Sequence, residues 1–336
     1  MEKGEIKKPL DLSTRNPEPV PIDAIDLNPG GCCMSYGFDL EPLKESLRLH
    51  GLLNTPLVRE KRGRGFGVVS GYRRVLALKA LGSPEIPCRI LAEREMDDLQ
   101  ALLLNLHENL AARRFNEVEK AMVIARLSMH LAPREILKTY MPLLSLHSRP
   151  SVLEIYRGIE NDLDSTMKQA LVRGSLSVQA AGMLLELEKG DRKALFEWLI
   201  KFKFNMNQMI QAVDLIIDIS SIEGVRIARL LKEDEFSALA EEGQGNRPQQ
   251  ARHALSFLRA KRFPRLTRME QGFRKRVSGL NLPPKVRIQH PPGFESAEYR
   301  MEIVFENGSE LTDMIRFLSS VSGLERICEE GEGGGR

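Results

Sequence analysis

The chain has 336 residues, of which 42% are hydrophobic and 28% charged, and its formal net charge is +3. This length suits two or three domains, and the composition is typical of a globular protein. No apolar run is long enough to span a membrane and no secretory signal is present, so we expect a cytoplasmic protein. The four cysteines form no C-x-x-C pair, and no histidine cluster completes a zinc site, which argues against structural zinc.

Strands and helices alternate in the first part of the chain. PVPIDAID reads as a strand, FDLEPLKESLRLHG as an amphipathic helix, and PLVRE and FGVVS as strands joined by the basic turn KRGRG. After one more helix comes the strand IPCRIL. We therefore expect an α/β domain over residues 20–110, preceded by a flexible tail over residues 1–19.

The middle of the chain reads as almost wholly helical. Asn116 followed by Glu119 predicts a capping box at the start of one helix. PREILKTYM and SLHSRPSVLEIYRGI predict two short helices joined by a turn, with Ser148 as the N-cap of the second and Pro150 in its first turn. This pattern favours a helix-turn-helix domain over residues 111–239.

The last part combines a polar linker, a basic stretch and a small hairpin. EEGQGNRPQQ, residues 240–249, reads as a linker, and eight basic residues against one acid follow over residues 259–276. VRIQH and YRMEIVFE predict paired strands ahead of an amphipathic helix. We assign residues 240–284 to the linker and basic helix, 285–322 to a dimerisation module and 323–336 to a flexible tail. The whole is expected to be an α+β protein.

One turn in the first domain poses an electrostatic question. In VVSGYRRVLALKALG, residues 68–82, a strand ends in glycine and an apolar helical pattern runs on to Gly82. Arg73 and Arg74 fall in the first turn of this helix, where the positive end of the helix dipole disfavours cations. An anion bound at this turn would explain both arginines, because backbone N–H groups and guanidinium groups then act together on it. Solvated arginines, or pairs with a local acid such as Glu60, remain the alternative.

The order of these motifs resembles the ParB family, with its ParB/sulfiredoxin-like N-terminal domain. The series LRLHGLLNTPLVRE, GYRRVLALKALG and IPCRIL is similar to the family's helix, strand and "G-x-R-R" turn. HENLAARRFNEVEKA resembles the family's "E-N" and "N-x-x-E-x-A" motifs. VRGSLSVQAAGMLLEL resembles the motif that follows the family's helix-turn-helix. YRMEIVFENGSELTDMIRFL is similar to its C-terminal dimerisation module. The resemblance covers roughly residues 20–220, and more weakly residues 285–320.

The resemblance implies a homodimeric chromosome or plasmid partition protein that binds a centromere-like site on double-stranded DNA and uses CTP with Mg²⁺ to become a clamp. It also implies nucleoid association and a Walker-type partner ATPase, and leaves hydrolysis of CTP open. Glu108 would hold the metal. The implied nucleotide-binding residues are Gly71, Tyr72, Arg73, Arg74, Glu108 and Asn109. The DNA-binding residues expected from the helix-turn-helix are Ser148, Arg149, Ser151, Arg157, Lys168 and Arg173.

The chain departs from the family pattern at two positions of the nucleotide motifs. Tyr72 stands where the family commonly has a glutamate, and Ala112 where it carries an arginine, although Arg113 and Arg114 lie next door. These departures keep a second function open, a ParB-like transcriptional regulator that does not couple to nucleotide. An enzyme such as a nuclease is disfavoured, because the sequence has no convincing two-metal carboxylate cluster.

Overall fold

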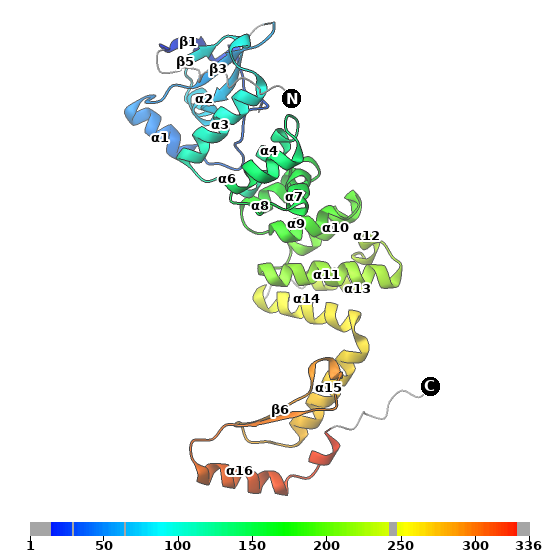
Figure 1. Ribbon diagram of the computed structural model, residues 1–336. Coiled ribbons are helices and arrows are strands. Elements are labelled where there is room, and N and C mark those ends of the chain that lie inside the picture. The colour runs from blue at the N-terminus through cyan, green and yellow to red at the C-terminus, as the bar shows by residue number, and fades with distance from the viewer. Residues whose placement is uncertain (1–14, 29, 64, 242–246, 328–336) are drawn as a thin grey trace. The chain divides into compact units, whose positions relative to one another are not determined.

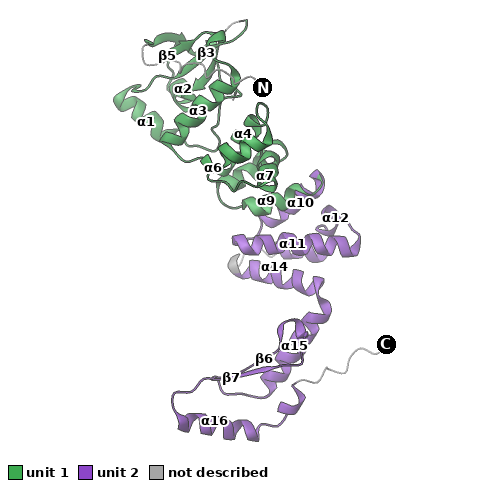
Figure 2. Ribbon diagram, in the orientation of Figure 1, with its two compact units in different colours: residues 1–188 green, residues 189–336 purple. Residues whose placement is uncertain are grey.

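The computed structural model describes residues 15–28, 30–63, 65–241 and 247–327. The chain divides into two compact units, residues 1–188 and residues 189–336 (Figure 2). This division has fewer parts than the six predicted segments, and its boundary falls inside the helix-turn-helix domain predicted over residues 111–239.

A mixed sheet of five strands forms the first part of unit 1 (Figure 1). The strands are β1 (Glu18–Pro21), β2 (Ile25–Asp26), β3 (Leu57–Glu60), β4 (Phe66–Ser70) and β5 (Glu85–Leu91). Their order is β1-β5-β3-β4-β2, with β3 antiparallel to β4 and parallel to β5. Helix α1 (Glu41–His50) precedes β3, and α2 (Tyr72–Ala80) connects β4 to β5. Val75 of α2 is fully buried against strand residues such as Val58 and Ile86, so α2 covers the sheet.

The strand predicted over residues 19–26 is interrupted. A short 3-10 helix, η1 (Ile22–Ala24), separates β1 from β2, which pair with β5 and β4 at opposite edges of the sheet. A flat five-stranded sheet would place its edges about 19 Å apart, whereas four residue steps span at most ~14 Å. The sheet must therefore curl, and this short connection is one reason.

The rest of unit 1 is helical, as predicted. Its helices are α3 (Asp98–Ala112), α4 (Glu117–Leu127), α5 (Pro133–Glu135), the π-helix η3 (Ile136–Tyr140), α6 (Met141–Leu143), α7 (Pro150–Asn161), α8 (Ser165–Val172) and α9 (Val178–Leu185), with the 3-10 helix η2 (Glu93–Glu95) before α3. The capping box of Asn116 and Glu119 at α4 is confirmed. The N-cap predicted at Ser148 is wrong: Pro150 occupies the first helical position of α7, so Arg149 is the N-cap residue.

Unit 2 begins with a helical part. Its helices are α10 (Lys189–Leu199), α11 (Met206–Glu223), α12 (Ile227–Leu230), α13 (Asp234–Glu241), α14 (Arg247–Arg262) and α15 (Pro264–Gly279). The indole N–H of Trp198 donates to the carbonyl of Phe236 at 3.1 Å and ties α10 to α13. The predicted linker over residues 240–249 is wrong for residues 240–241, which end α13, and for residues 247–249, which start α14. Residues 242–246 lie outside the described residues.

The C-terminal hairpin and helix form as predicted. Strands β6 (Val286–Gln289) and β7 (Arg300–Ile303) are antiparallel, and α16 (Gly308–Ser320) follows them. The short 3-10 helices are η4 (Pro292–Phe294) and η5 (Leu324–Arg326). In the parts of the chain that the structure describes, no helix combines the length and apolarity needed to cross a membrane.

Candidate functional site

The turn between β4 and α2 requires glycine. Gly71 has φ +88°, and a Cβ added there would lie 3.0 Å from the Cα of Pro56. The backbone N–H of Val75 donates to the carbonyl of Gly71 at 3.1 Å, the first bond of the helix. No described side chain caps this N-terminus. The N–H groups of the first turn are therefore available to an anion.

Arg74 and Glu108 meet beside this turn. The guanidinium of Arg74 donates to the carbonyl of Asn54 at 2.6 Å and to Oε1 of Glu108 at 3.2 Å. The hydroxyl of Ser70, the last residue of β4, donates to the other oxygen of Glu108. Strand β4, helix α2 and helix α3 thus each contribute one polar side chain to the same place.

Asn109 supports the position of Glu108 and is not itself part of the group formed by Arg74, Glu108 and Ser70. Its amide donates to the carbonyl and to the side-chain oxygen of Asn105, at 2.9 and 2.8 Å. Asn105 is buried and donates in turn to the carbonyl of Val69 in β4 at 2.5 Å. These bonds fix the register of α3 on β4, and with it the position of Glu108.

Arg73 points to a different partner from Arg74. Its Nη2 donates to Oε1 of Glu119 at 2.7 Å, its Nε to the hydroxyl of Ser35 at 3.3 Å, and its guanidinium lies 4.5 Å from the ring centre of Phe38. Burial lowers the pKa of Arg73, and the nearby charge of Arg113 lowers it further. The two arginines of the turn therefore pair with Glu119 and Glu108, and neither pairs with Glu60.

Glu119 is a buried carboxylate shared by two arginines. Its side chain is 1% exposed, and Arg113 Nη1 donates to Oε2 at 2.6 Å. The backbone N–H groups of Tyr36 and Asn116 also donate to it, at 3.2 and 3.1 Å. Four donors thus satisfy one buried anion, as a buried charge requires.

Arg113 was missed by the sequence analysis. It is the C-cap residue of α3, and besides Glu119 it contacts Asn109 Oδ1 at 2.8 Å and the carbonyl of Met34 at 2.8 Å. The available signal was its position directly after Ala112, where the family pattern places an arginine. In the structure Arg113 connects α3, α4 and the loop before α1.

Tyr72 faces a separate cavity. Its hydroxyl donates to the carbonyl of Leu27 at 3.0 Å, and burial raises its pKa. The cavity has a volume of about 290 Å³, and Cys32 and Cys33 are among its lining residues. Burial raises the pKa of both thiols, which makes them poor nucleophiles. Within the described ranges, no three His, Cys, Asp or Glu side chains are grouped to hold a metal ion.

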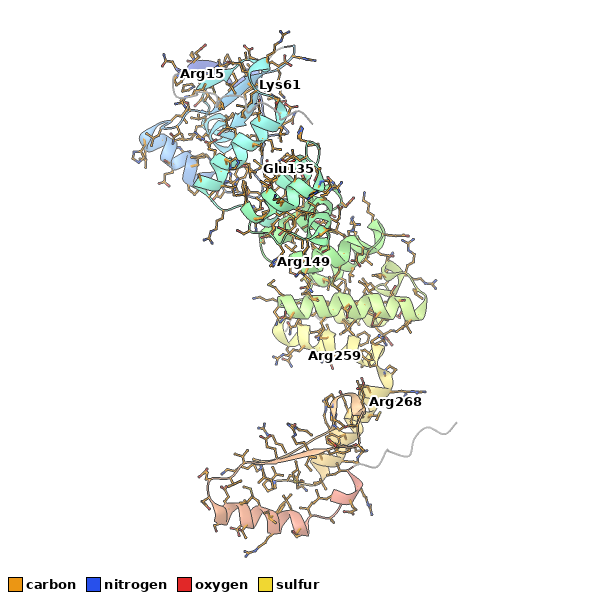
Figure 3. The ribbon with its side chains drawn as sticks, viewed as in Figure 1. Arg15, Lys61, Glu135, Arg149, Arg259 and Arg268 are labelled. Carbon is orange, nitrogen blue, oxygen red and sulfur yellow. The ribbon has the colours of Figure 1, made fainter. Side chains whose placement is uncertain are left out.

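Three of the six predicted DNA-binding residues lie together at the start of α7. Ser148, Arg149 and Ser151 are all exposed, and the Arg149 side chain bonds to no described residue (Figure 3). An unpaired arginine at a helix N-terminus suits contact with DNA, because the N-terminal residues of a recognition helix face the base edges.

The other three predicted residues have mixed surroundings. Arg157 pairs with Glu154 at 2.9 Å in an exposed i,i+3 contact. Lys168 is half-buried and donates to both the carboxylate and the carbonyl of Glu160, at 2.8 and 2.6 Å. Arg173 is exposed at the end of α8. Lys168 is therefore the least available of the six.

A family model identifies the first part of the chain. Residues 11–110 match the model of the ParB N-terminal domain. Over these residues the match agrees with the resemblance to the ParB family that the motifs indicated.

Relatives of known name extend the match beyond this ParB domain. The chain is 28% identical over 208 residues to stage 0 sporulation protein J of Bacillus subtilis, covering 61% of this chain and 70% of that protein. It is 27% identical over 176 residues to the probable chromosome-partitioning protein ParB of Vibrio cholerae, covering 52% and 57%. The match thus spans little more than half of the Vibrio protein.

A solved structure was also matched, that of the C-terminally truncated chromosome-partitioning protein ParB from Caulobacter crescentus complexed with CTP-gamma-S. Its identity is 24%, it covers 55% of this chain and 98% of that chain, and its TM-score is 0.26. A TM-score this low carries no argument about the arrangement of this chain.

Proposed function

We propose that this chain is a ParB-like partition protein that binds CTP with Mg²⁺ in its first unit and a centromere-like DNA site through its helix-turn-helix. The observation that carries the nucleotide part is the uncapped N-terminus of α2, with Arg74 and Glu108 beside it. CTP as the nucleotide, and a Walker-type ATPase as partner, come from the resemblance to the family.

The residues at this turn fit a triphosphate. Backbone N–H groups after Gly71 and the guanidinium of Arg74 are donors for phosphate oxygens. Arg74 is 22% exposed, so a ligand can reach it. A single carboxylate, Glu108, suits Mg²⁺, because this ion is commonly held by one or two carboxylates together with substrate phosphates.

Arg73 reaches a phosphate only by leaving Glu119. Arg113 stays bonded to the same carboxylate in that event, so the buried charge keeps one cationic partner. A buried acid with two arginines can release one at lower cost than an acid with a single partner, since no charge is left uncompensated. Arg113 is therefore a positioning residue in this proposal.

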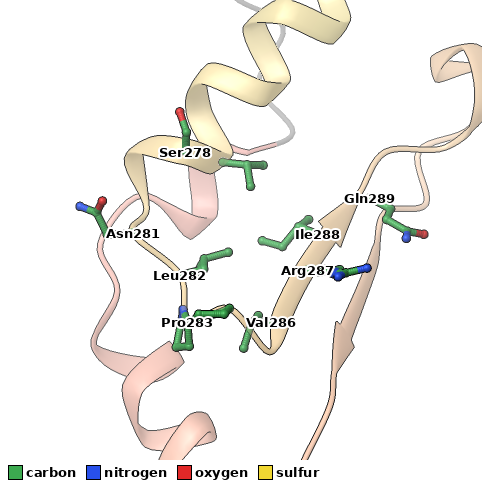
Figure 4. A pocket seen from close by; sticks show the side chains of 10 residues that line it. Ser278, Asn281, Leu282, Pro283, Val286, Arg287, Ile288 and Gln289 are labelled. Atoms are coloured by element: carbon green, nitrogen blue, oxygen red, sulfur yellow. The ribbon is translucent and has the colours of Figure 1, made fainter. Parts of the chain in front are cut away.

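Dimerisation is proposed for the C-terminal hairpin and helix. No residue of α16 is buried, and Met301, Phe305, Ile315 and Phe317 are exposed. Beside them, Leu282, Val286 and Ile288 line a cavity of about 540 Å³ between the end of α15 and β6 (Figure 4). A second copy packed here would remove apolar surface from water and cover the sheet edge.

The regulator without nucleotide coupling is supported by two observations. Arg73 is committed to Glu119, and Tyr72 bonds to Leu27 rather than offering the family's acidic group. A protein that keeps these bonds in all its states would still bind DNA through α7.

Recovery of genomic DNA fragments by the full-length protein, with and without CTP and Mg²⁺, tests the proposal. A clamp recovers one discrete site without nucleotide and fragments flanking that site when CTP is added. Recovery of the discrete site alone under both conditions would favour the regulator. Recovery of no discrete site would refute both.

A further inference from the structure

Arg126 of α4 is a buried cation with an unpaired group. The residue is only 9% exposed, and its Nη1 has no hydrogen-bond partner among the described residues. Burial lowers the pKa of Arg126, and the opposing influences come from Cys33, Glu160 and Cys32. The carboxylate of Glu160 is held by Lys168 at 2.8 Å. A buried charge is normally paired, so the two thiols are the groups left to supply a counter-charge.

The thiols of Cys32 and Cys33 share one cavity. These neighbouring residues are both buried, and both line the cavity of about 290 Å³ beside Tyr72. A hydrogen bond of 3.1 Å from the N–H of Cys33 to the carbonyl of Gly30 closes the turn that carries them. Burial raises the pKa of both thiols, and the charge of Arg126 acts in the opposite direction. Two sulfur ligands are thus held in one turn near an unpaired cation.

The carboxylates that line this cavity are already engaged. Lys61, which Figure 3 labels, pairs with Asp26, and Arg59 pairs with Asp98. A hard cation such as Mg²⁺ or Ca²⁺, which takes oxygen ligands, would have to displace these pairs. The sulfur atoms are free of such partners, and sulfur ligands select soft metal ions.

Charge balance distinguishes among the soft ions. A cysteine binds a metal as the thiolate, so two cysteines bring two negative charges. With Cu(I) the complex keeps one net negative charge, which the guanidinium of Arg126 neutralises. With Zn²⁺ the complex is neutral and Arg126 stays unpaired. Zn²⁺ also takes four ligands, whereas no three His, Cys, Asp or Glu side chains are grouped in the described part of the chain.

We propose that Cys32 and Cys33 bind one Cu(I) ion as thiolates, with Arg126 as the counter-charge of the complex. Two protons pass from the thiols to solvent and two sulfur–copper bonds form, without electron transfer. Gly31 and Met129 are exposed residues of the lining, so the ion can enter from solvent, and the thioether of Met129 is a further soft group. Binding of Cu(I) goes beyond the proposed function and requires neither CTP nor DNA.

The test compares two double variants of the full-length protein. C32A/C33A removes the two proposed ligands. C88A/C328A removes the other two cysteines of the chain and is the matched control. Each protein is titrated with Cu(I) without oxygen, in competition with the coloured chelator bathocuproine disulfonate, at several pH values between about 6 and 8.

The native protein and C88A/C328A should bind one Cu(I) ion, and C32A/C33A should lose this binding. Because both thiols are protonated before the ion binds, the logarithm of the affinity should rise by about 2 for each pH unit. R126Q should bind Cu(I) about tenfold more weakly or worse, which corresponds to the loss of one charged hydrogen bond. R126K keeps the charge and should bind more tightly than R126Q.

Binding of Cu(I) by C32A/C33A equal to that of the native protein overturns the inference, and so does an affinity that does not change with pH. A preference of the native protein for Zn²⁺ over Cu(I), or equal affinities of R126Q and the native protein, would refute the role of Arg126 as counter-charge. Circular dichroism checks the folding of each variant. If C32A/C33A is unfolded, the single variants C32S and C33S replace it, and each should lose the ion.

Discussion

Removal of the Glu119 carboxylate should destabilise unit 1 strongly. The side chain is 1% exposed and accepts hydrogen bonds from Arg73, Arg113 and two backbone N–H groups. In Glu119→Ala, two half-buried guanidinium groups lose their counter-charge. Removing one partner of a buried ion pair costs about 3–5 kcal/mol. Because Arg73 and Arg113 are 30% and 20% exposed, we expect a loss near the lower end, about 3 kcal/mol.

The effect should be confined to unit 1. Hydrogen exchange of the α4 amides, followed by mass spectrometry across a urea series, reports the unfolding of unit 1. Trp198 is the sole tryptophan and lies in unit 2, so its fluorescence is an internal reference. Glu135→Ala is the matched control, because Glu135 is exposed on α5. It should change the stability by less than about 0.5 kcal/mol.

The double variant Arg113→Ala/Glu119→Ala separates charge from packing. If uncompensated charge is the cause, removing one guanidinium should recover part of the loss, and the two substitutions should be strongly non-additive. A Glu119→Ala variant as stable as Glu135→Ala would refute the argument that this carboxylate holds α2, α3 and α4 together.

Three further predictions concern DNA, pH and assembly. In an electrophoretic shift assay, Arg149→Ala should weaken binding to the specific DNA site by about 1–3 kcal/mol and leave binding to random DNA unchanged. An equal loss of affinity for specific and random DNA would contradict a role of Arg149 in reading bases. The hydrogen bond from Arg59 lowers the pKa of Asp98, so this pair stabilises unit 1 at neutral pH and the stabilisation is lost as pH falls below about 4. In urea titrations at several pH values, Arg59→Gln should therefore reduce the loss of stability at low pH. An unchanged pH profile of stability would count against the pair. Phe305→Asp/Ile315→Asp should sediment as a monomer at micromolar concentration while Leu53→Asp stays dimeric, and a persisting dimer would exclude the C-terminal joint.

Local signals predicted most of the fold. The β-branched run before Gly71 and the apolar spacing after it predicted β4 and α2, because strand and helix periodicity are encoded by near neighbours. The errors also have local causes. Pro150 takes the first helical position and moves the cap from Ser148 to Arg149. Pro248 was included in the predicted linker, although a proline in the first turn of a helix is tolerated.

The candidate site was only partly predictable. The sequence indicated Arg73, Arg74 and Glu108 as one group, and the structure brings Arg74 and Glu108 together. It could not indicate that Arg73 pairs with Glu119, 46 residues away, because that contact depends on how α4 packs beside α2. The same limit applies to Arg113, whose partners come from three segments that meet only in the folded unit.

Calorimetric titration of the full-length protein with CTP, ATP, GTP and UTP tests the central claim most directly. The titration is run with Mg²⁺, with and without DNA. The account predicts binding of CTP in preference to the other three, at least in the presence of DNA, and loss of most of this binding in Arg74→Ala, since a charged hydrogen bond is worth roughly 1.5–3 kcal/mol. Absence of CTP binding by the native protein with Mg²⁺ and DNA present, or equal binding by Arg74→Ala, would contradict it.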